Sequence, residues 1–252
     1  MNVDIWSDIA CPWCYIGKRR FETALAEFPH KDQITVTWHS FQLDPSIPEH
    51  YDGTELDYLS KRKGMQPAHV SQMFEHVAEV AAGEGLAYDF GSVVVANSFA
   101  GHELIHLAKA RDSGNAGTGV GGKNTADAVK EALLSAHFEK GQDIGSREVL
   151  VAIGTAAGLT ETEITDALDA GTYRDAVRAD IRQAQMLGIQ GVPFFVIDSK
   201  YGVSGAQPAE LFARALDTAW RESNPLVMVN SPANPTDASD ELNGEACGPD
   251  GC

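Results

Sequence analysis

The stretch that decides the fold of this chain is Val3-Asp4-Ile5-Trp6-Ser7-Asp8-Ile9-Ala10-Cys11-Pro12-Trp13-Cys14-Tyr15-Ile16-Gly17. Its first residues have the pattern of a buried strand, and the run from Tyr15 to Phe28 has the pattern of an amphipathic helix. Pro12 is tolerated in a first helical turn, where its missing N–H would be unpaired anyway. Cys11 and Cys14 are therefore expected at a helix N-terminus, where free backbone N–H groups and the helix dipole favour a thiolate. The thiolate is the reactive form of cysteine, so the pair indicates a dithiol that exchanges electrons.

The patterns outside this stretch predict an α/β protein with a long helical interruption. Strands are expected at 3–7 and 34–38, before and after the first helix. Strand character returns at 193–197 and 201–204, and a last helix is expected at 207–222. Between these two groups the patterns predict helices at 54–63, 67–83, 97–112, 124–140, 146–157, 161–169 and 173–187. The order β-α-β, helices, β-β-α indicates one α/β domain interrupted by an all-helical insertion.

Composition limits the partners and the compartment. The chain has 252 residues and a formal net charge of −17, which repels a phosphate backbone and argues against nucleic acid. No run approaches the roughly 20 apolar residues that cross a bilayer, so no membrane partner is expected. Because no signal peptide pattern precedes the first strand, we expect a cytoplasmic protein, in which cysteines are more often catalytic or metal-binding than structural.

Three segments resemble a known family. Ser7–Gly17 is similar to the active-site segment of DsbA-like thioredoxin-fold oxidoreductases, in particular their cytoplasmic FrnE branch. Gly191-Val192-Pro193-Phe194-Phe195 resembles the cis-proline loop of that branch, and Val203-Ser204-Gly205-Ala206-Gln207 resembles the segment after it. The resemblance covers about residues 1–223. It implies a thioredoxin-like domain formed by 1–43 and 188–223, a helical insertion domain at 44–187 and an extended tail at 224–252.

The resemblance also implies roles for single residues. Cys11 would be the exposed cysteine that attacks or is attacked, with a depressed pKa, and the more buried Cys14 would resolve the mixed disulfide. Pro193 would be a cis proline that projects the backbone of Val192 toward Cys11. The N–H and C=O of Val192 could then pair with an extended substrate. Pro12 and Trp13, between the cysteines, would face the substrate.

A second cysteine pair lies in the tail, where Cys247 and Cys252 enclose four residues. The flexible chain between Pro225 and Cys247 spans on the order of 25–30 Å, so the pair could reach Cys11. We expect an auxiliary redox centre that relays disulfides to or from Cys11 and Cys14.

The implied activity is that of a thiol–disulfide oxidoreductase or disulfide isomerase. Its substrates would be disulfides of proteins or of small thiols. No cofactor is required, and glutathione or another thiol could serve as the electron partner. A monomer and a dimer remain equally open.

Several alternatives stay open beside this interpretation. A glutathione-dependent isomerase or transferase of the 2-hydroxychromene-2-carboxylate isomerase or kappa type shares the fold, although those enzymes typically carry serine in place of Cys11. A holdase that uses an apolar patch near Trp13 is the non-enzymatic candidate. The four cysteines could instead bind one zinc ion, although a thiol pair at a helix start favours redox work.

Two further motifs are weaker. His102-Glu103-Leu104-Ile105-His106 matches the H-E-x-x-H pattern of zinc proteases, but no third ligand follows, and we predict no metal site. Substrate contact by His102 or Asn97 is the more modest alternative. The glycine-rich run 117–122 contains G-x-G-x-x-G but follows a helix, so a loop is expected there.

Overall fold

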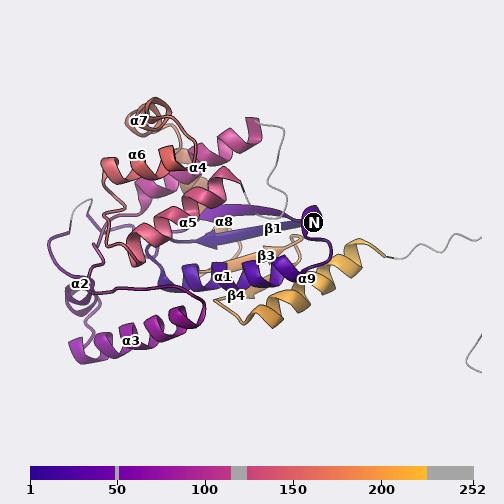
Figure 1. Cartoon of the computed structure of the whole chain (residues 1–252), viewed down its shortest axis with the longest axis horizontal. Helices are drawn as coiled ribbons and strands as arrows, with labels where there is room; N and C mark the ends of the chain where they lie inside the picture. Colours follow the sequence, from indigo (N-terminus) through magenta and orange to yellow (C-terminus); the bar gives the residue numbers. More distant parts are fainter. Residues whose placement is uncertain (49–50, 115–123, 226–252) are drawn as a thin grey trace, which may run out of the picture.

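The computed structural model describes residues 1–48, 51–114 and 124–225. Its four strands form one mixed sheet in the order β2-β1-β3-β4 (Figure 1). Strand β1 (Asn2–Ser7) pairs in parallel with β2 (Thr35–Ser40) and antiparallel with β3 (Phe194–Ile197). Strand β4 (Tyr201–Ser204) pairs antiparallel with β3. The predicted order, β-α-β at the start and β-β-α at the end, is confirmed.

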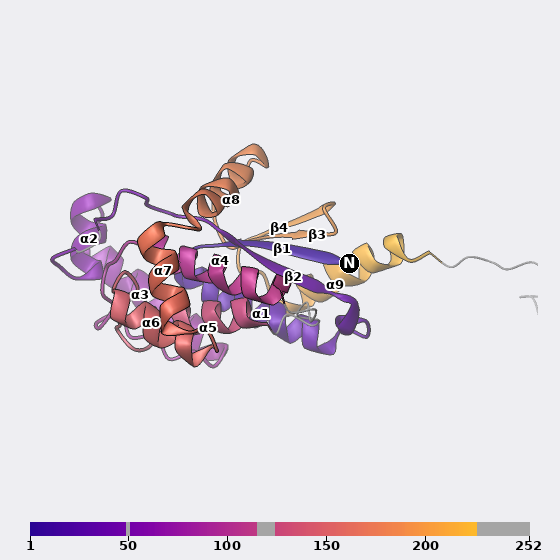
Figure 2. The same ribbon diagram turned by 90° about the horizontal axis from the view of Figure 1, so that it is seen from above.

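Helices flank the sheet on both faces (Figure 2). Helices α1 (Pro12–Glu27) and α9 (Ala209–Ser223) pack against each other and against the face that carries Val3 and Ile5. Helix α8 (Arg174–Met186) covers the opposite face, where Trp6 packs against Ala184. Between β2 and α8 the chain forms α2 (Glu55–Arg62), α3 (Pro67–Gly83), α4 (Phe99–Gly114), α5 (Thr125–Phe138), α6 (Arg147–Ala156) and α7 (Glu161–Ala170). A short 3-10 helix, η1 (Lys31–Gln33), precedes β2.

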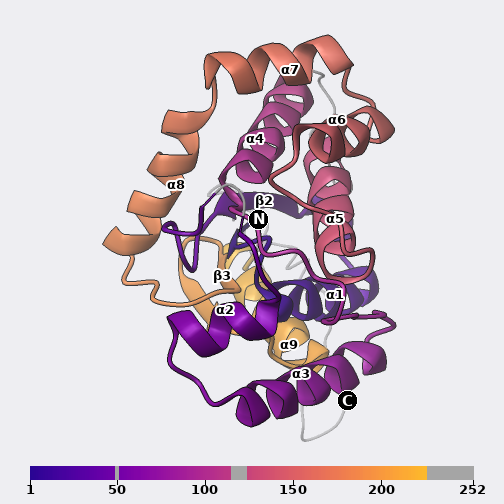
Figure 3. The same ribbon diagram turned by 90° about the vertical axis from the view of Figure 1, so that its left-hand side faces the viewer.

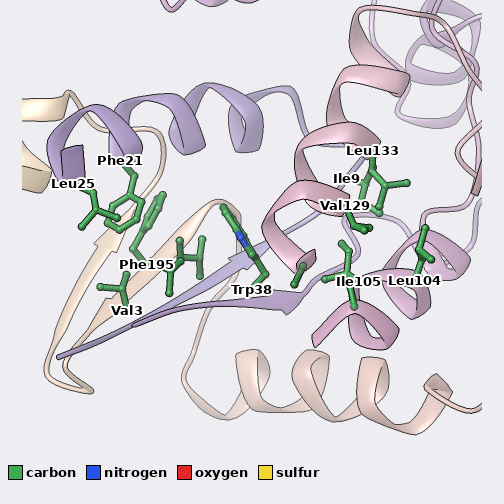
Figure 4. Packing of buried hydrophobic residues seen from close by; sticks show 14 of the residues in the cluster. Val3, Ile9, Phe21, Leu25, Trp38, Leu104, Ile105, Val129, Leu133 and Phe195 are labelled. Atoms are coloured by element: carbon green, nitrogen blue, oxygen red, sulfur yellow. The ribbon is translucent and has the colours of Figure 1, made fainter. Parts of the chain in front are cut away.

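The largest apolar cluster runs from the sheet into the inserted helices without a break. Figure 4 shows Phe21 of α1 beside Phe195 of β3 at one end, and Ile105 and Leu133 of the inserted helices at the other. Trp38 of β2 lies between these groups. Because the insertion shares this core, its helices help to support the sheet. The expected domain boundaries at 43/44 and 187/188 stay a prediction.

The helix ends follow local sequence signals to different degrees. Thr160 caps α7, since its side chain accepts a hydrogen bond from the Glu163 backbone N–H in a capping box. Ser146 lies at the N-cap of α6 but donates its hydroxyl to Glu148 at 2.6 Å instead of capping the helix.

Among the described helices, none is long and apolar enough to span a bilayer.

Candidate functional site

The two cysteines lie where β1 passes into α1. Cys11 is the N-cap residue of α1, with Pro12 in the first turn, and no side chain caps this helix end. The backbone N–H of Cys14 donates to the Cys11 carbonyl at 3.0 Å. Both side chains are free thiols. The predicted position of the pair at a helix N-terminus is therefore confirmed, and the helix dipole there favours negative charge on sulfur.

The proline loop faces this pair from a segment about 180 residues away in the sequence. The Val192–Pro193 peptide bond is cis, as expected. Cys11 Sγ lies 3.5 Å from the Val192 carbonyl oxygen, so the thiol donates to this oxygen when its proton does not point to the Cys14 sulfur. Pro193 is buried and Val192 is partly exposed. The structure thus brings Cys11, Cys14, Val192 and Pro193 together.

Gly17 allows this close approach. A Cβ atom at this position would lie 2.8 Å from Cγ of Pro193 and 3.5 Å from the Cα of Ala206. No real Cβ tolerates the first distance, so any side chain here would push α1 away from the proline loop. The glycine one turn after the second cysteine is therefore a requirement of the site, because it lets the loop rest directly on α1.

The thiol pair differs from expectation in exposure. Cys11 is 4% exposed and Cys14 is 1% exposed. Cys11 is thus the more accessible of the two, but it is buried rather than exposed. The reason is that Val192 and the proline loop cover its sulfur.

The pKa directions of the thiols also differ from expectation. A hydrogen bond with the Cys14 thiol, followed by burial, raises the pKa of Cys11 well above its ordinary value. Burial opposes ionisation of Cys14, but the hydrogen bond from Cys11 and the positive charge of Lys130 outweigh it and lower the pKa of Cys14. The expected depressed pKa of Cys11 is therefore wrong for this state. The physical reason is that the two sulfurs titrate as a pair, and the positive charge of Lys130 favours ionisation of the inner sulfur, Cys14, before that of Cys11.

Lys130 is a fully buried cation beneath the pair. It lies on α5 and is 1% exposed, and its ammonium donates to the Ser7 carbonyl at 3.3 Å. Burial lowers the pKa of Lys130 to about 8, against the opposing effects of Cys14 and Asp8. An ammonium with this pKa is charged at neutral pH but can release its proton without a large cost.

Asp8 supplies the buried negative charge of the same region. Burial disfavours the carboxylate, but hydrogen bonds from His102 Nε2 at 3.3 Å and the Leu43 backbone N–H at 2.8 Å lower the pKa of Asp8. Asp8 lies between β1 and α1, whereas Lys130 lies on α5 and His102 on α4. The insertion therefore supplies two of the three groups. This arrangement places a charged polar layer directly under the cysteines.

Trp13 and its neighbours form the outer rim of the site. Trp13 is partly buried, and its ring centroid lies 6.4 Å from that of His76 on α3. The Pro12 carbonyl accepts a hydrogen bond from the Tyr88 hydroxyl at 2.6 Å. Leu43, in the segment that follows β2, is an exposed apolar side chain near Asp8. The rim therefore combines residues of α1 with residues of the insertion.

The H-E-x-x-H pattern is structural. His102 is buried against Asp8, and His106 Nε2 donates to Asp180 Oδ2 at 2.9 Å. Across residues 1–48, 51–114 and 124–225, no group of three or more His, Cys, Asp and Glu side chains is arranged to hold a metal ion. Of the two residues considered for substrate contact, Asn97 at the start of α4 is the more accessible.

Asp180 joins three elements on the opposite face of the sheet. Besides His106, it accepts hydrogen bonds from His39 Nδ1 at 2.9 Å and from the Ser40 backbone N–H at 2.8 Å. His39 in turn donates from Nε2 to Asp4 at 2.8 Å. This cluster connects α8 and α4 to β1 and β2.

Asp8 and Lys130 were not predicted as site residues from the sequence. The sequence does contain a signal for Lys130, because its spacing from the buried residues Ala126, Leu133 and Leu134 places a lysine on the apolar face of a helix. Cys247, Cys252 and the glycine-rich run 117–122 lie outside the described residues.

Comparisons with known proteins place this chain in one family. The DSBA-like thioredoxin domain family matches residues 2–217. A probable DsbA oxidoreductase from Streptomyces coelicolor is 41% identical in its crystal structure, with 100% of this chain and 98% of that chain covered and a TM-score of 0.79. The YwbO protein of Bacillus subtilis is 26% identical over 220 residues, which cover 86% of this chain and 96% of YwbO.

A more distant structure shares the fold. The cytosolic disulfide reductase DsbM from Pseudomonas aeruginosa, determined with GSH, is 21% identical. The similarity covers 88% of this chain and 100% of that chain, with a TM-score of 0.61. Assignment to the FrnE branch stays a prediction.

Proposed function

Since the chain belongs to the DsbA-like thioredoxin domain family, we propose that it is a thiol–disulfide oxidoreductase or isomerase that works through Cys11 and Cys14. The observation that carries the proposal is the contact between the Cys11 sulfur and the Val192 carbonyl beside the cis Pro193. This contact puts a helix-terminal thiol next to backbone groups that can bind an extended chain. The family supports thiol–disulfide exchange in general, and the assignment to this pair is ours.

The first step requires a thiolate on Cys11. Once the pair has lost its first proton, transfer of the remaining proton from Cys11 to the Cys14 sulfur produces that thiolate. The Cys11 thiolate attacks one sulfur of a substrate disulfide, and the other sulfur leaves as a thiolate. The product is a mixed disulfide between Cys11 and the substrate.

The second step releases the substrate. Cys14 gives up its proton, which ends on the departing thiolate, and its sulfur attacks Cys11 in the mixed disulfide. The thiolate that left in the first step takes its proton from water, so the substrate disulfide is reduced to two thiols while Cys11 and Cys14 are oxidised to one disulfide. The charge of Lys130 stabilises the Cys14 thiolate that this step needs.

The substrate is proposed to bind along the proline loop. Val192 is partly exposed beside the buried Pro193, and Pro12 and Trp13 are partly exposed on the other side of the thiols. An extended backbone could pair with the N–H and C=O of Val192, as in strand addition. We propose disulfides of proteins or small thiols as substrates, and glutathione or another thiol as the electron partner in the cytoplasm.

Insulin reduction tests the proposal. We expect the full chain to reduce insulin disulfides in the presence of glutathione, and Cys11→Ser to abolish this activity. Cys14→Ser is the matched variant, which should form mixed disulfides without turnover. Activity that survives Cys11→Ser would refute the proposal and favour a holdase. Glutathione-dependent isomerisation of a small aromatic substrate, without insulin reduction, would instead favour the isomerase alternative.

The tail pair is proposed as an auxiliary redox centre. Replacing Cys247 and Cys252 together by serine should slow disulfide isomerisation while Cys11 and Cys14 still react with a small disulfide. Unchanged rates of insulin reduction and isomerisation would refute the relay.

A further inference from the structure

A cavity of about 630 Å³ lies within the insertion, bordered by α4, α6, α7 and α8. Figure 3 shows these four helices together on one side of the molecule. Phe99, Ala100, Leu150 and Leu168 provide apolar walls. The size suits a ligand of several residues or a comparable small molecule.

Three arginines line this cavity in a chain whose net charge is −17. Arg174 and Arg178 are one turn apart on α8, so they lie on the same face of that helix. Arg147 begins α6. The lining therefore places three guanidinium groups around one cavity, and guanidinium groups are well suited to bind carboxylates.

The acidic partners of these three arginines occupy only a few of the arginine N–H donors. Arg178 donates to Asp175 at 3.2 Å, and Arg147 pairs with Asp169. Arg174 Nε lies 3.7 Å from Glu103 Oε1, which is an ion pair but longer than a hydrogen bond. A guanidinium has five N–H donors in a fork that matches a carboxylate, so each arginine can still bind one.

Glu103 is the opposing charge in the same cavity. It is 4% exposed, and its Oε1 atom has no hydrogen-bond partner among the described residues. Burial raises the pKa of Glu103, against the opposing charges of Arg174 and Arg178. A buried carboxylate oxygen without a donor is costly, and because Oε1 is closed to solvent, the Glu103 side chain has to rotate before a donor on a ligand can relieve that cost.

We propose that this cavity binds a small zwitterion with at least two carboxylates and one ammonium group, independently of the thiol chemistry. The carboxylates would pair with Arg147, Arg174 and Arg178, and the ammonium would donate to Glu103. A simple anion such as phosphate fits less well, because Glu103 repels it. The apolar walls would hold the aliphatic part of the ligand.

Calorimetric titration with S-methylglutathione tests the proposal. This tripeptide has two carboxylates and one ammonium, and it has no free thiol, so its binding is separate from disulfide exchange. We expect the full chain to bind it and the double variant Arg174→Gln/Arg178→Gln to bind it about tenfold more weakly or worse. Both arginines are about half exposed, so their replacement leaves the fold intact.

The matched control is Arg182→Gln, an exposed arginine on the same helix that does not line the cavity. It should bind S-methylglutathione as the unchanged chain does. Equal affinity of the double variant would overturn the proposal, since binding would then be elsewhere, for example at the thiols. Inorganic phosphate binding as tightly as S-methylglutathione would also overturn it. Either failure would leave the insulin assay, and thus the proposed function, untouched.

Discussion

Replacing the buried Lys130 by methionine should make the protein more stable and its thiols less reactive. Methionine has nearly the length of lysine, so Lys130→Met removes the charge with little change in packing. The Asp8 carboxylate keeps its own donors, His102 and the Leu43 backbone. The substitution therefore isolates the energetic effect of the ammonium beneath the cysteines.

The size of the effect follows from the pKa. Burial lowers the pKa of Lys130 from 10.5 to about 8, and each pKa unit corresponds to about 1.36 kcal/mol. The charged lysine thus costs about 3 kcal/mol of folding free energy at neutral pH. Loss of the hydrogen bond to the Ser7 carbonyl destabilises the variant by about 1 kcal/mol, which offsets part of this gain. We expect a net stabilisation of about 2 kcal/mol by Lys130→Met.

The stabilisation by Lys130→Met should depend on pH. The folded pKa of Lys130 lies below its unfolded value, so the cost is fully present below about pH 8 and disappears as the pH rises toward about 10.5. Urea unfolding of reduced protein should show the largest gap between variant and unchanged chain near pH 7, and a smaller gap near pH 10. The rate of thiol alkylation at neutral pH should fall, because the pKa of Cys14 rises without the lysine. A variant that is less stable at pH 7, or a gap that does not shrink with pH, would refute this reasoning.

Two further substitutions test the supports of the site. Gly17→Ala should lower the free energy of unfolding in urea by about 1–3 kcal/mol and slow disulfide exchange, because its Cβ would collide with Pro193. The matched control is Gly83→Ala, which has open space around it and should be neutral or slightly stabilising. For His39, burial opposes protonation, but hydrogen bonds to Asp180 and Asp4 raise its pKa above 6.5. The stability that charged His39 contributes is fully present below about pH 6.5 and declines as the pH rises through its raised pKa. The free energy of unfolding of the unchanged chain minus that of His39→Gln should therefore fall between pH 6 and 9, because the effect of Lys130 is the same in both proteins and cancels. A Gly17→Ala protein as stable as Gly83→Ala, or an equal pH response in His39→Gln, would contradict these assignments.

The sequence predicted the elements that depend on local pattern. The order of strands and helices along the chain and the helix that follows Cys11 were predicted from apolar periodicity, and the cis Pro193 was expected from the resemblance. The burial of Cys11 and the direction of its pKa were not predictable in this way. The burial depends on the covering loop at Val192, and the pKa direction depends on the charge of Lys130. Each lies more than 100 residues from Cys11 in the chain.

The same limit applies to the cavity in the insertion. Arg147 and Arg174 lie on different helices, and Glu103 lies on a third. Each residue taken alone has the pattern of a solvated helix face or, for Glu103, of a helix interior. Their convergence is a property of helix packing, which no local sequence pattern encodes.

Trapping a mixed disulfide tests the central claim most directly. The Cys14→Ser variant, which cannot complete the second step, is incubated with glutathione disulfide and its peptides are mapped by mass spectrometry. We expect one glutathione bound to residue 11, and no glutathione on residue 14 of the Cys11→Ser variant under the same conditions. A Cys11 that stays unmodified, or a Cys14 that reacts equally well without it, would show that Cys11 is not the attacking thiol.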